Sequence, residues 1–236
     1  MKNAHQGLWF AALFALLLGC LTAGWYAQAA VDYGYRFWYG QMDIGAHIDK
    51  FGPRNRYIHG FQHTSEEERI RVFAEIVDAV HHHGEGLADI RFHTASGPHR
   101  LLREPEVQHL QDVANLIDVL SWAGLVALVA GLAAVLLLVR GGVRPRWKAQ
   151  AGWLSGFVAL AVALVLIIGP RQVFYQFHVW IFPEGHQWFF YYQDSLMSTL
   201  MKAPDLFGGI ALAILLSGLL VFSVLLLLIG RVQRSL

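Results

Sequence analysis

Residues 173–196 read VFYQFHVWIFPEGHQWFFYYQDSL and lie between two long apolar runs. The segment holds aromatic rings, a Pro-Glu-Gly turn, two histidines and an Asp-Ser pair, so it is too polar to stay in hydrocarbon. Trp and Tyr concentrate at the lipid headgroup level, because an apolar ring with a polar tip suits that boundary. The stretch is therefore predicted to lie at a membrane surface. Its interfacial belt comprises Tyr175, Trp180, Trp188, Tyr191 and Tyr192.

His178 is the residue of this stretch that an aromatic belt does not explain. An imidazole at the point where a transmembrane helix emerges must find a hydrogen-bonding partner or take part in chemistry. Ionisable groups in membrane segments are functional candidates by default. The position alone therefore makes His178 a candidate catalytic residue.

The composition is that of an integral membrane protein. Of the 236 residues, 56% are hydrophobic and only 15% are charged, which excludes an ordinary soluble domain. Lys and Arg in short loops set the orientation of the spans. They gather before the first apolar run, between the second and third, and after the fourth: Lys2; Arg140, Arg144, Arg146 and Lys148; Arg231 and Arg234. We expect these regions, and both termini, to be cytoplasmic.

The predicted fold is an all-α four-helix transmembrane bundle with a small mixed α/β extracytoplasmic domain. Its segments, in chain order, are a first transmembrane helix (1–30), an extracytoplasmic domain (31–112), a second transmembrane helix (113–139), a cytoplasmic basic loop (140–152), a third transmembrane helix (153–169), an outer loop with the aromatic belt (170–205), and a fourth transmembrane helix with a cytoplasmic tail (206–236).

The first apolar run has two alternative interpretations as a secretory signal. Residues 17–20, Leu-Leu-Gly-Cys, resemble a lipoprotein-processing box, and Ala27-Gln28-Ala29 resembles the pattern before a signal-peptidase cut. The residues after Cys20 remain apolar, however, and an apolar length of about 20 residues favours a retained span. Because Cys20 is the only cysteine, no disulfide can form within the chain, and the outer domain must be held by packing.

The outer domain shows strand and helix patterns. Aromatic residues at alternate positions from Tyr33 to Tyr39 are typical of a strand with one aromatic face. Thr64 and Glu67 form a capping box before an amphipathic helix over residues 65–83. We interpret the apolar stripe of this helix as a packing face. Residues 87–93 alternate loosely and favour a second strand, followed by a turn over residues 96–98.

A second candidate site stands at the entrance to the second span. Pro105 suits the first position of a helix, and no breaker follows before the pair Gly141-Gly142, so one continuous helix is predicted. His109 and Asp112 are three residues apart on its exposed turns, where the carboxylate can hold or polarise the imidazole. The alternative is a solvated helix start with an acid at the positive end of the helix dipole.

Other chemistries have weaker support in the sequence. The usual zinc spacings are absent, and a metal site would draw on His59, His63 and the run His81 to His83. That run at a helix end is equally well explained as an electrostatic cap. Ser195 has no nucleophile-elbow motif around it, and Cys20 lies among apolar neighbours that make a thiol inert. Acid–base work by imidazoles is therefore the favoured chemistry.

Two segments resemble the lipoprotein intramolecular transacylase (Lit) family of bacterial membrane proteins. That family has four spans, an outer domain after the first, a His-Met-x-Asp-Val motif entering the second, and a Phe-His, aromatic and Asp-Ser-Leu motif between the third and fourth. The counterparts here are His109-Leu110-Gln111-Asp112-Val113, residues 177–183 (FHVWIFP), and residues 188–196. The resemblance covers the whole architecture, and its diagnostic residues occupy about thirty positions.

The resemblance implies an activity and a site. Family members move an acyl chain from the glycerol ester of a lipoprotein's diacylglyceryl-cysteine to the α-amino group of that cysteine. The resemblance also implies that His109 and His178 are the essential catalytic pair and that Asp112 is an orienting residue. It implies more weakly that Asp194 contributes to the site. It implies no cofactor and no metal. The expected partners are a diacylated lipoprotein and membrane lipid, with no nucleic acid, in the bacterial cytoplasmic membrane with an extracytoplasmic active site.

The first hypothesis is therefore a four-span acyltransferase that uses His109 and His178. The second is a non-enzymatic metal-binding or sensor protein of the membrane that uses the outer histidines, and the third is a structural partner in a membrane complex. Metal analysis of the purified protein would separate the second hypothesis from the first.

Overall fold

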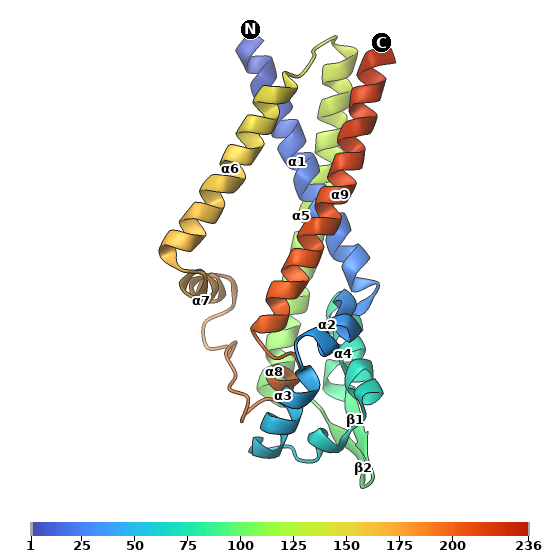
Figure 1. Cartoon of the computed structure of the whole chain (residues 1–236), viewed down its shortest axis with the longest axis vertical. Helices are drawn as coiled ribbons and strands as arrows, with labels where there is room; N and C mark the ends of the chain where they lie inside the picture. Colours follow the sequence, from blue (N-terminus) through green and yellow to red (C-terminus); the bar gives the residue numbers. More distant parts are fainter. Residues whose placement is uncertain (1, 236) are drawn as a thin grey trace. The chain divides into compact units, whose positions relative to one another are not determined.

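The computed structural model describes residues 2–235, and the chain is mostly helical (Figure 1). Met1 and Leu236, the ends of the first and last predicted segments, lie outside the described residues. The chain divides into two compact units. The first unit comprises Met1–Trp25, Ser121–Ile181 and Leu215–Leu236, and the second comprises Tyr26–Leu120 and Phe182–Ile214.

Four helices within residues 2–235 are long and apolar enough to cross a membrane, with mean hydropathies from 2.0 to 3.0. This confirms the expectation of four spans. The helices are α1 (Lys2–Ala29), α5 (Glu104–Arg140), α6 (Trp147–Ile168) and α9 (Asp205–Ser235). The continuous helix predicted from Pro105 is α5, which begins one residue earlier and ends directly before Gly141.

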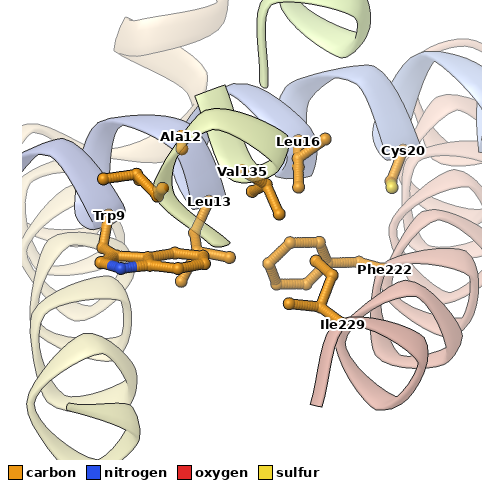
Figure 2. Packing of buried hydrophobic residues seen from close by; sticks show 9 residues of the cluster. Trp9, Ala12, Leu13, Leu16, Cys20, Val135, Phe222 and Ile229 are labelled. Carbon is orange, nitrogen blue, oxygen red and sulfur yellow. The ribbon is translucent and has the colours of Figure 1, made fainter. Parts of the chain in front are cut away.

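The core of the first unit is built where α1 meets α5 and α9. Figure 2 shows side chains of α1, from Trp9 to Cys20, facing Val135 of α5 and Phe222 of α9. Small residues permit the close approach of these helices. A Cβ on Gly131 would lie 2.9 Å from Leu16, and one on Gly19 would lie 2.6 Å from the Cβ of Leu128. These two glycines are therefore required for packing.

Helix α6 joins the first unit through aromatic contacts with α1. The rings of Phe10 and Trp153 lie 6.0 Å apart, and those of Phe14 and Phe157 lie 5.1 Å apart, both edge to face. Gly169, with a φ of +96°, ends α6. The chain then turns into α7 (Pro170–Ile181), which Figure 1 shows almost end-on, so that it runs across the direction of α6. The first half of the aromatic stretch is thus a separate short helix.

The second unit contains short helices and one hairpin. The helices are α2 (Tyr35–Gln41), α3 (Ile44–Phe51), α4 (Glu66–His81) and α8 (Leu196–Leu200), with short 3₁₀ turns at Asp32–Gly34, Gly52–Arg54, Phe61–His63 and Leu87–Asp89. Strands β1 (Arg91–Thr94) and β2 (Gly97–Arg100) pair antiparallel, with Phe92 opposite His99. The strand expected over residues 87–93 therefore starts later, after a 3₁₀ turn.

The strand predicted from Tyr33 to Tyr39 is wrong, because this region is the 3₁₀ turn at Asp32–Gly34 followed by α2. Tyr35 and Tyr39 are four residues apart, a spacing that belongs to one face of a helix as well as one face of a strand. Both are buried, whereas Phe37 between them is 60% exposed. A strand face would have buried all three, so the pattern fits a helix.

The amphipathic helix α4 is confirmed, with a different cap. Its N-cap is Ser65, whose hydroxyl oxygen accepts a hydrogen bond from the backbone N–H of Glu68 at 3.2 Å, so the cap lies one residue after the expected Thr64. The apolar stripe is buried as a packing face. Within it Phe73 stacks on Tyr35 at 3.9 Å, and the Tyr35 hydroxyl donates to the carbonyl of Leu200 at 2.7 Å. This contact fixes α8 and the chain that leads into it.

Candidate functional site

The start of α5 is anchored by a buried carboxylate. Glu106 is fully buried in the third position of the helix, and one of its oxygens accepts the backbone N–H of Arg103 at 2.8 Å. This is the carboxylate half of a capping box. The Arg103 guanidinium lies 3.2 Å from the same oxygen. The first turns of α5, which carry His109, are therefore held in place at their start.

Ser195 connects this anchor to the aromatic stretch. Its hydroxyl donates to the other oxygen of Glu106 at 2.6 Å, and the same hydroxyl oxygen accepts the backbone N–H of Ser198 at 2.9 Å as the N-cap of α8. The serine of the Asp-Ser pair therefore links the start of α5 to the start of α8 through hydrogen bonds. Asp194 forms an ion pair with Arg56 at 3.2 Å in the same unit.

We expect Ser195→Ala to lower the free energy of unfolding by about 2–4 kcal/mol, since a helix cap and a buried hydrogen bond to the Glu106 carboxyl group are both lost. Unfolding in mixed detergent micelles measures this. Ser65→Ala is the matched control, because it removes the cap of α4 without a buried carboxylate and should cost about 1 kcal/mol. Equal losses in the two variants would contradict a role for Glu106 in anchoring residue 195.

His109 lies between aromatic side chains on the second turn of α5. Its ring is 5.0 Å from that of Phe182 and 5.9 Å from that of Phe190, and both phenylalanines are buried. The next residue, Leu110, is also buried, which fixes the face of α5 that packs inward. His109 itself is half-buried. The imidazole is therefore held, partly buried, beside two phenylalanine rings.

Asp112 bonds to a histidine that the sequence analysis did not single out. Its carboxylate accepts a hydrogen bond from Nδ1 of His186 at 2.7 Å, and Nε2 of His186 lies 3.1 Å from the side-chain nitrogen of Gln108. The only sequence signal for His186 was its place after the Pro-Glu-Gly turn. The predicted role of Asp112, to orient His109, stays a prediction.

His178 belongs to α7, in the first unit. Its Nδ1 lies 2.8 Å from the carbonyl oxygen of Phe174, and because a carbonyl only accepts, Nδ1 carries the hydrogen. A neutral ring therefore has its lone pair on Nε2. Burial lowers the pKa of His178, and the hydrogen bond to the Phe174 carbonyl opposes this in part. The imidazole is thus kept neutral at pH 7, as a general base requires.

The predicted site residues divide between the two units. His109, Asp112 and Asp194 lie in the second unit and His178 in the first. The structure joins Asp112 to His186 and Asp194 to Arg56. The pairing of His109 with His178 stays a prediction.

The outer histidines have local partners. His81 donates from Nδ1 to the carbonyl of Val77 at 2.8 Å, and Nδ1 of His83 lies 2.8 Å from Asp118. The hydrogen bond to Asp118 raises the pKa of His83. Among residues 2–235, no group of three or more His, Cys, Asp or Glu side chains is arranged to hold a metal ion. The metal-binding hypothesis stays a prediction.

Comparison with known protein families decides the class of this chain. A family model described as "Lipoprotein intramolecular transacylase Lit" matches residues 61–203, more than half of the sequence. The chain belongs to the Lit family. It is therefore a multi-pass membrane protein and an acyltransferase. The resemblance seen in the sequence motifs is confirmed.

Solved structures of the membrane integral Lit from Bacillus cereus share the fold. One has a TM-score of 0.66 and covers 100% of this chain and 100% of its own. Two others, solved with a histidine replaced by arginine or by alanine, each have a TM-score of 0.68 and cover 99% of this chain and 93% or 95% of theirs. The identity is 15% in each case, so the similarity shows the fold of this Lit family member. Comparison with curated protein sequences gave no match.

Proposed function

We propose that this chain moves an acyl chain from the glycerol ester of a diacylated lipoprotein's N-terminal cysteine to the α-amino group of that cysteine. The observation that carries the proposal is the family match over residues 61–203, because this range contains both His109 and His178. The substrate already holds amine and ester together, so positioning supplies much of the rate.

The proposed chemistry needs two proton transfers. The neutral amine attacks the ester carbonyl, and one imidazole removes the proton that the new C–N bond releases. The C–O bond of the ester then breaks, and the departing alkoxide takes a proton from the other imidazole. The products are an amide and a free glycerol hydroxyl, with no covalent enzyme intermediate. His109 and His178 are the proposed catalytic pair. Asp112 orients His109, and Asp194 contributes through its position next to Ser195.

Charge segregation supports the proposed orientation. None of the 17 acidic residues of the chain falls in the first unit, whereas Arg and Lys gather around the α5–α6 connection and in the last turns of α9. Figure 1 shows that the first turns of α1, the last turns of α9 and the α5–α6 connection lie at one end of that unit. By the positive-inside rule this end is cytoplasmic. The segments between the first and second spans, and between the third and fourth, are then extracytoplasmic.

Helix α7 fits the proposed membrane surface. It carries exposed apolar side chains, with Trp180 77% and Phe177 44% exposed, and it runs across the direction of α6 (Figure 1). A short helix of this kind lies in the headgroup region with its apolar side chains in the lipid. His178 would then stand at the depth of the substrate's glycerol ester, which supports its proposed role.

The test is conversion of a synthetic diacylated lipopeptide by the purified protein in nanodiscs. Because the product is an isomer of the substrate, its total mass is unchanged, and fragmentation with mild alkaline hydrolysis is needed. We expect one acyl chain to survive hydrolysis as an amide and the terminal amine to stop reacting with amine reagents. An N-acetylated lipopeptide is the control, because it has no acceptor amine. Release of free fatty acid instead would indicate a hydrolase and overturn the proposal.

A further inference from the structure

Residues 182–190 form a segment that closes over His109 in the second unit. Phe182 and Phe190, at its two ends, are 8% and 7% exposed, and both rings contact the His109 ring. We call residues 182–190 the covering segment. The two ends of the covering segment contact the candidate catalytic imidazole. A contact that holds the middle of this segment therefore also holds the side chains around His109.

A tight turn brings the middle of the covering segment to α5. The backbone N–H of His186 donates to the carbonyl of Pro183 at 3.2 Å, and Gly185 has a φ of +85°, a conformation that side chains other than glycine rarely adopt. The Pro-Glu-Gly sequence therefore encodes this turn. It presents the His186 side chain to the helix.

His186 joins two residues of α5 that flank His109. Gln108 and Asp112 are four residues apart and share one face of the helix. His186 reaches both, at 3.1 Å through Nε2 and 2.7 Å through Nδ1, and its side chain is 31% exposed against 11% for Asp112. One imidazole thus spans the helical turn that carries the candidate catalytic histidine.

The two partners select one tautomer of His186. The carboxylate of Asp112 only accepts, so Nδ1 carries the hydrogen, and the side-chain nitrogen of Gln108 only donates, so Nε2 accepts. Both ring nitrogens are then engaged with α5. A ring held in this way is unsuited to exchange protons with a substrate, and well suited to hold the segment in place.

We propose that His186 is a positioning residue of the acyl-transfer site, which holds the covering segment over His109 and fixes the carboxylate of Asp112. The inference rests on the proposed function, since it assigns His186 to the same reaction. It adds a contact between the motif at residues 109–113 of α5 and the chain between the third and fourth spans.

The activity test compares substitutions of His186 with a neighbour in the same turn. We expect His186→Ala to lower kcat roughly 10- to 100-fold with KM little changed, because the reacting imidazole loses its fixed surroundings and no substrate contact is removed. His186→Asn should recover much of the rate, since its amide nitrogen can replace Nδ1 as a donor to Asp112. Glu184→Ala, in the exposed part of the turn, is the matched control and should keep wild-type activity.

A double-mutant cycle tests the partner. Asp112→Asn combined with His186→Ala should lose little more activity than the worse single variant, because both remove one interaction. Fully additive losses would overturn the proposal, and so would a His186→Ala variant as active as the wild type. Retention of the native elution volume and helicity separates loss of positioning from loss of folding.

A readout without activity separates this inference from the proposed function. At about pH 8.5, above the ordinary pKa of histidine, ¹⁵N spectra of histidine-labelled protein should show His186 with the hydrogen on Nδ1. The signal is assigned by its absence in His186→Asn, and it should shift in Asp112→Asn. A wild type that shows this tautomer but makes no amide product refutes the proposed function alone. A hydrogen on Nε2 refutes the inference.

Discussion

His109→Ala is expected to lower kcat for amide formation roughly 100- to 10,000-fold, the range supplied by a positioned general acid or base. The reason is local. His109 is fixed on a helix whose start is anchored by the buried Glu106, and its ring is enclosed by Phe182 and Phe190. Neither phenylalanine can exchange a proton. The rate is measured by fragment mass spectrometry of the lipopeptide.

His59→Ala provides the control for this prediction. His59 is an exposed histidine of the same unit, so its loss removes an imidazole without touching the covering segment. We expect its activity to equal that of the wild type. A His109→Ala protein that folds normally and still forms the amide at the wild-type rate would remove His109 from the mechanism and leave the family fold intact.

The spans were predictable because hydrocarbon imposes a simple requirement on sequence. A helix must be about 20 apolar residues long to cross the bilayer, and α5 and α9 meet that requirement. The region around Tyr35 and Tyr39 was not predictable in the same way. Residues four apart share a face in both a strand and a helix, so the choice depended on the burial of Tyr35 against Phe73, a contact distant in sequence.

The candidate site was predictable only in part, for a related reason. His109 and His178 are conspicuous because they are ionisable groups beside long apolar runs. His186 is not conspicuous, and its bonds to Asp112 and Gln108 join residues more than seventy positions apart. The role of Ser195 was not predictable either. The sequence offered this residue as a candidate nucleophile and as part of a motif, whereas in the structure its hydroxyl donates to the buried Glu106. Pairing over such separations is set by the fold and leaves no local pattern.

His178→Ala is expected to reduce kcat by a factor similar to that of His109→Ala, and His178→Asn decides why. The imidazole has a structural contact, from Nδ1 to the carbonyl of Phe174, that an asparagine amide can reproduce. It also has a proposed proton-transfer role that asparagine cannot perform. If transfer is the role, His178→Asn is as inactive as His178→Ala. An active asparagine variant would mean that His178 only holds α7 together. Gln172→Ala, an exposed change on the same helix, is the control and should be fully active.

The pH dependence gives the same proposal an independent test. Burial lowers the pKa of His178 below its ordinary value of about 6.5. The ring therefore stays mainly neutral between pH 8 and about pH 6.5. Over this interval the substrate amine, whose ordinary pKa is about 7.7–8.0, takes up a proton while His178 does not. Below its lowered pKa His178 also takes up a proton, and the slope of log kcat/KM against pH should then steepen by about one if it is the base. The residual activity of His178→Asn should keep the shallower slope throughout. A wild-type profile that matches the His178→Asn profile over the whole pH range in which the protein stays folded would assign the base to another residue.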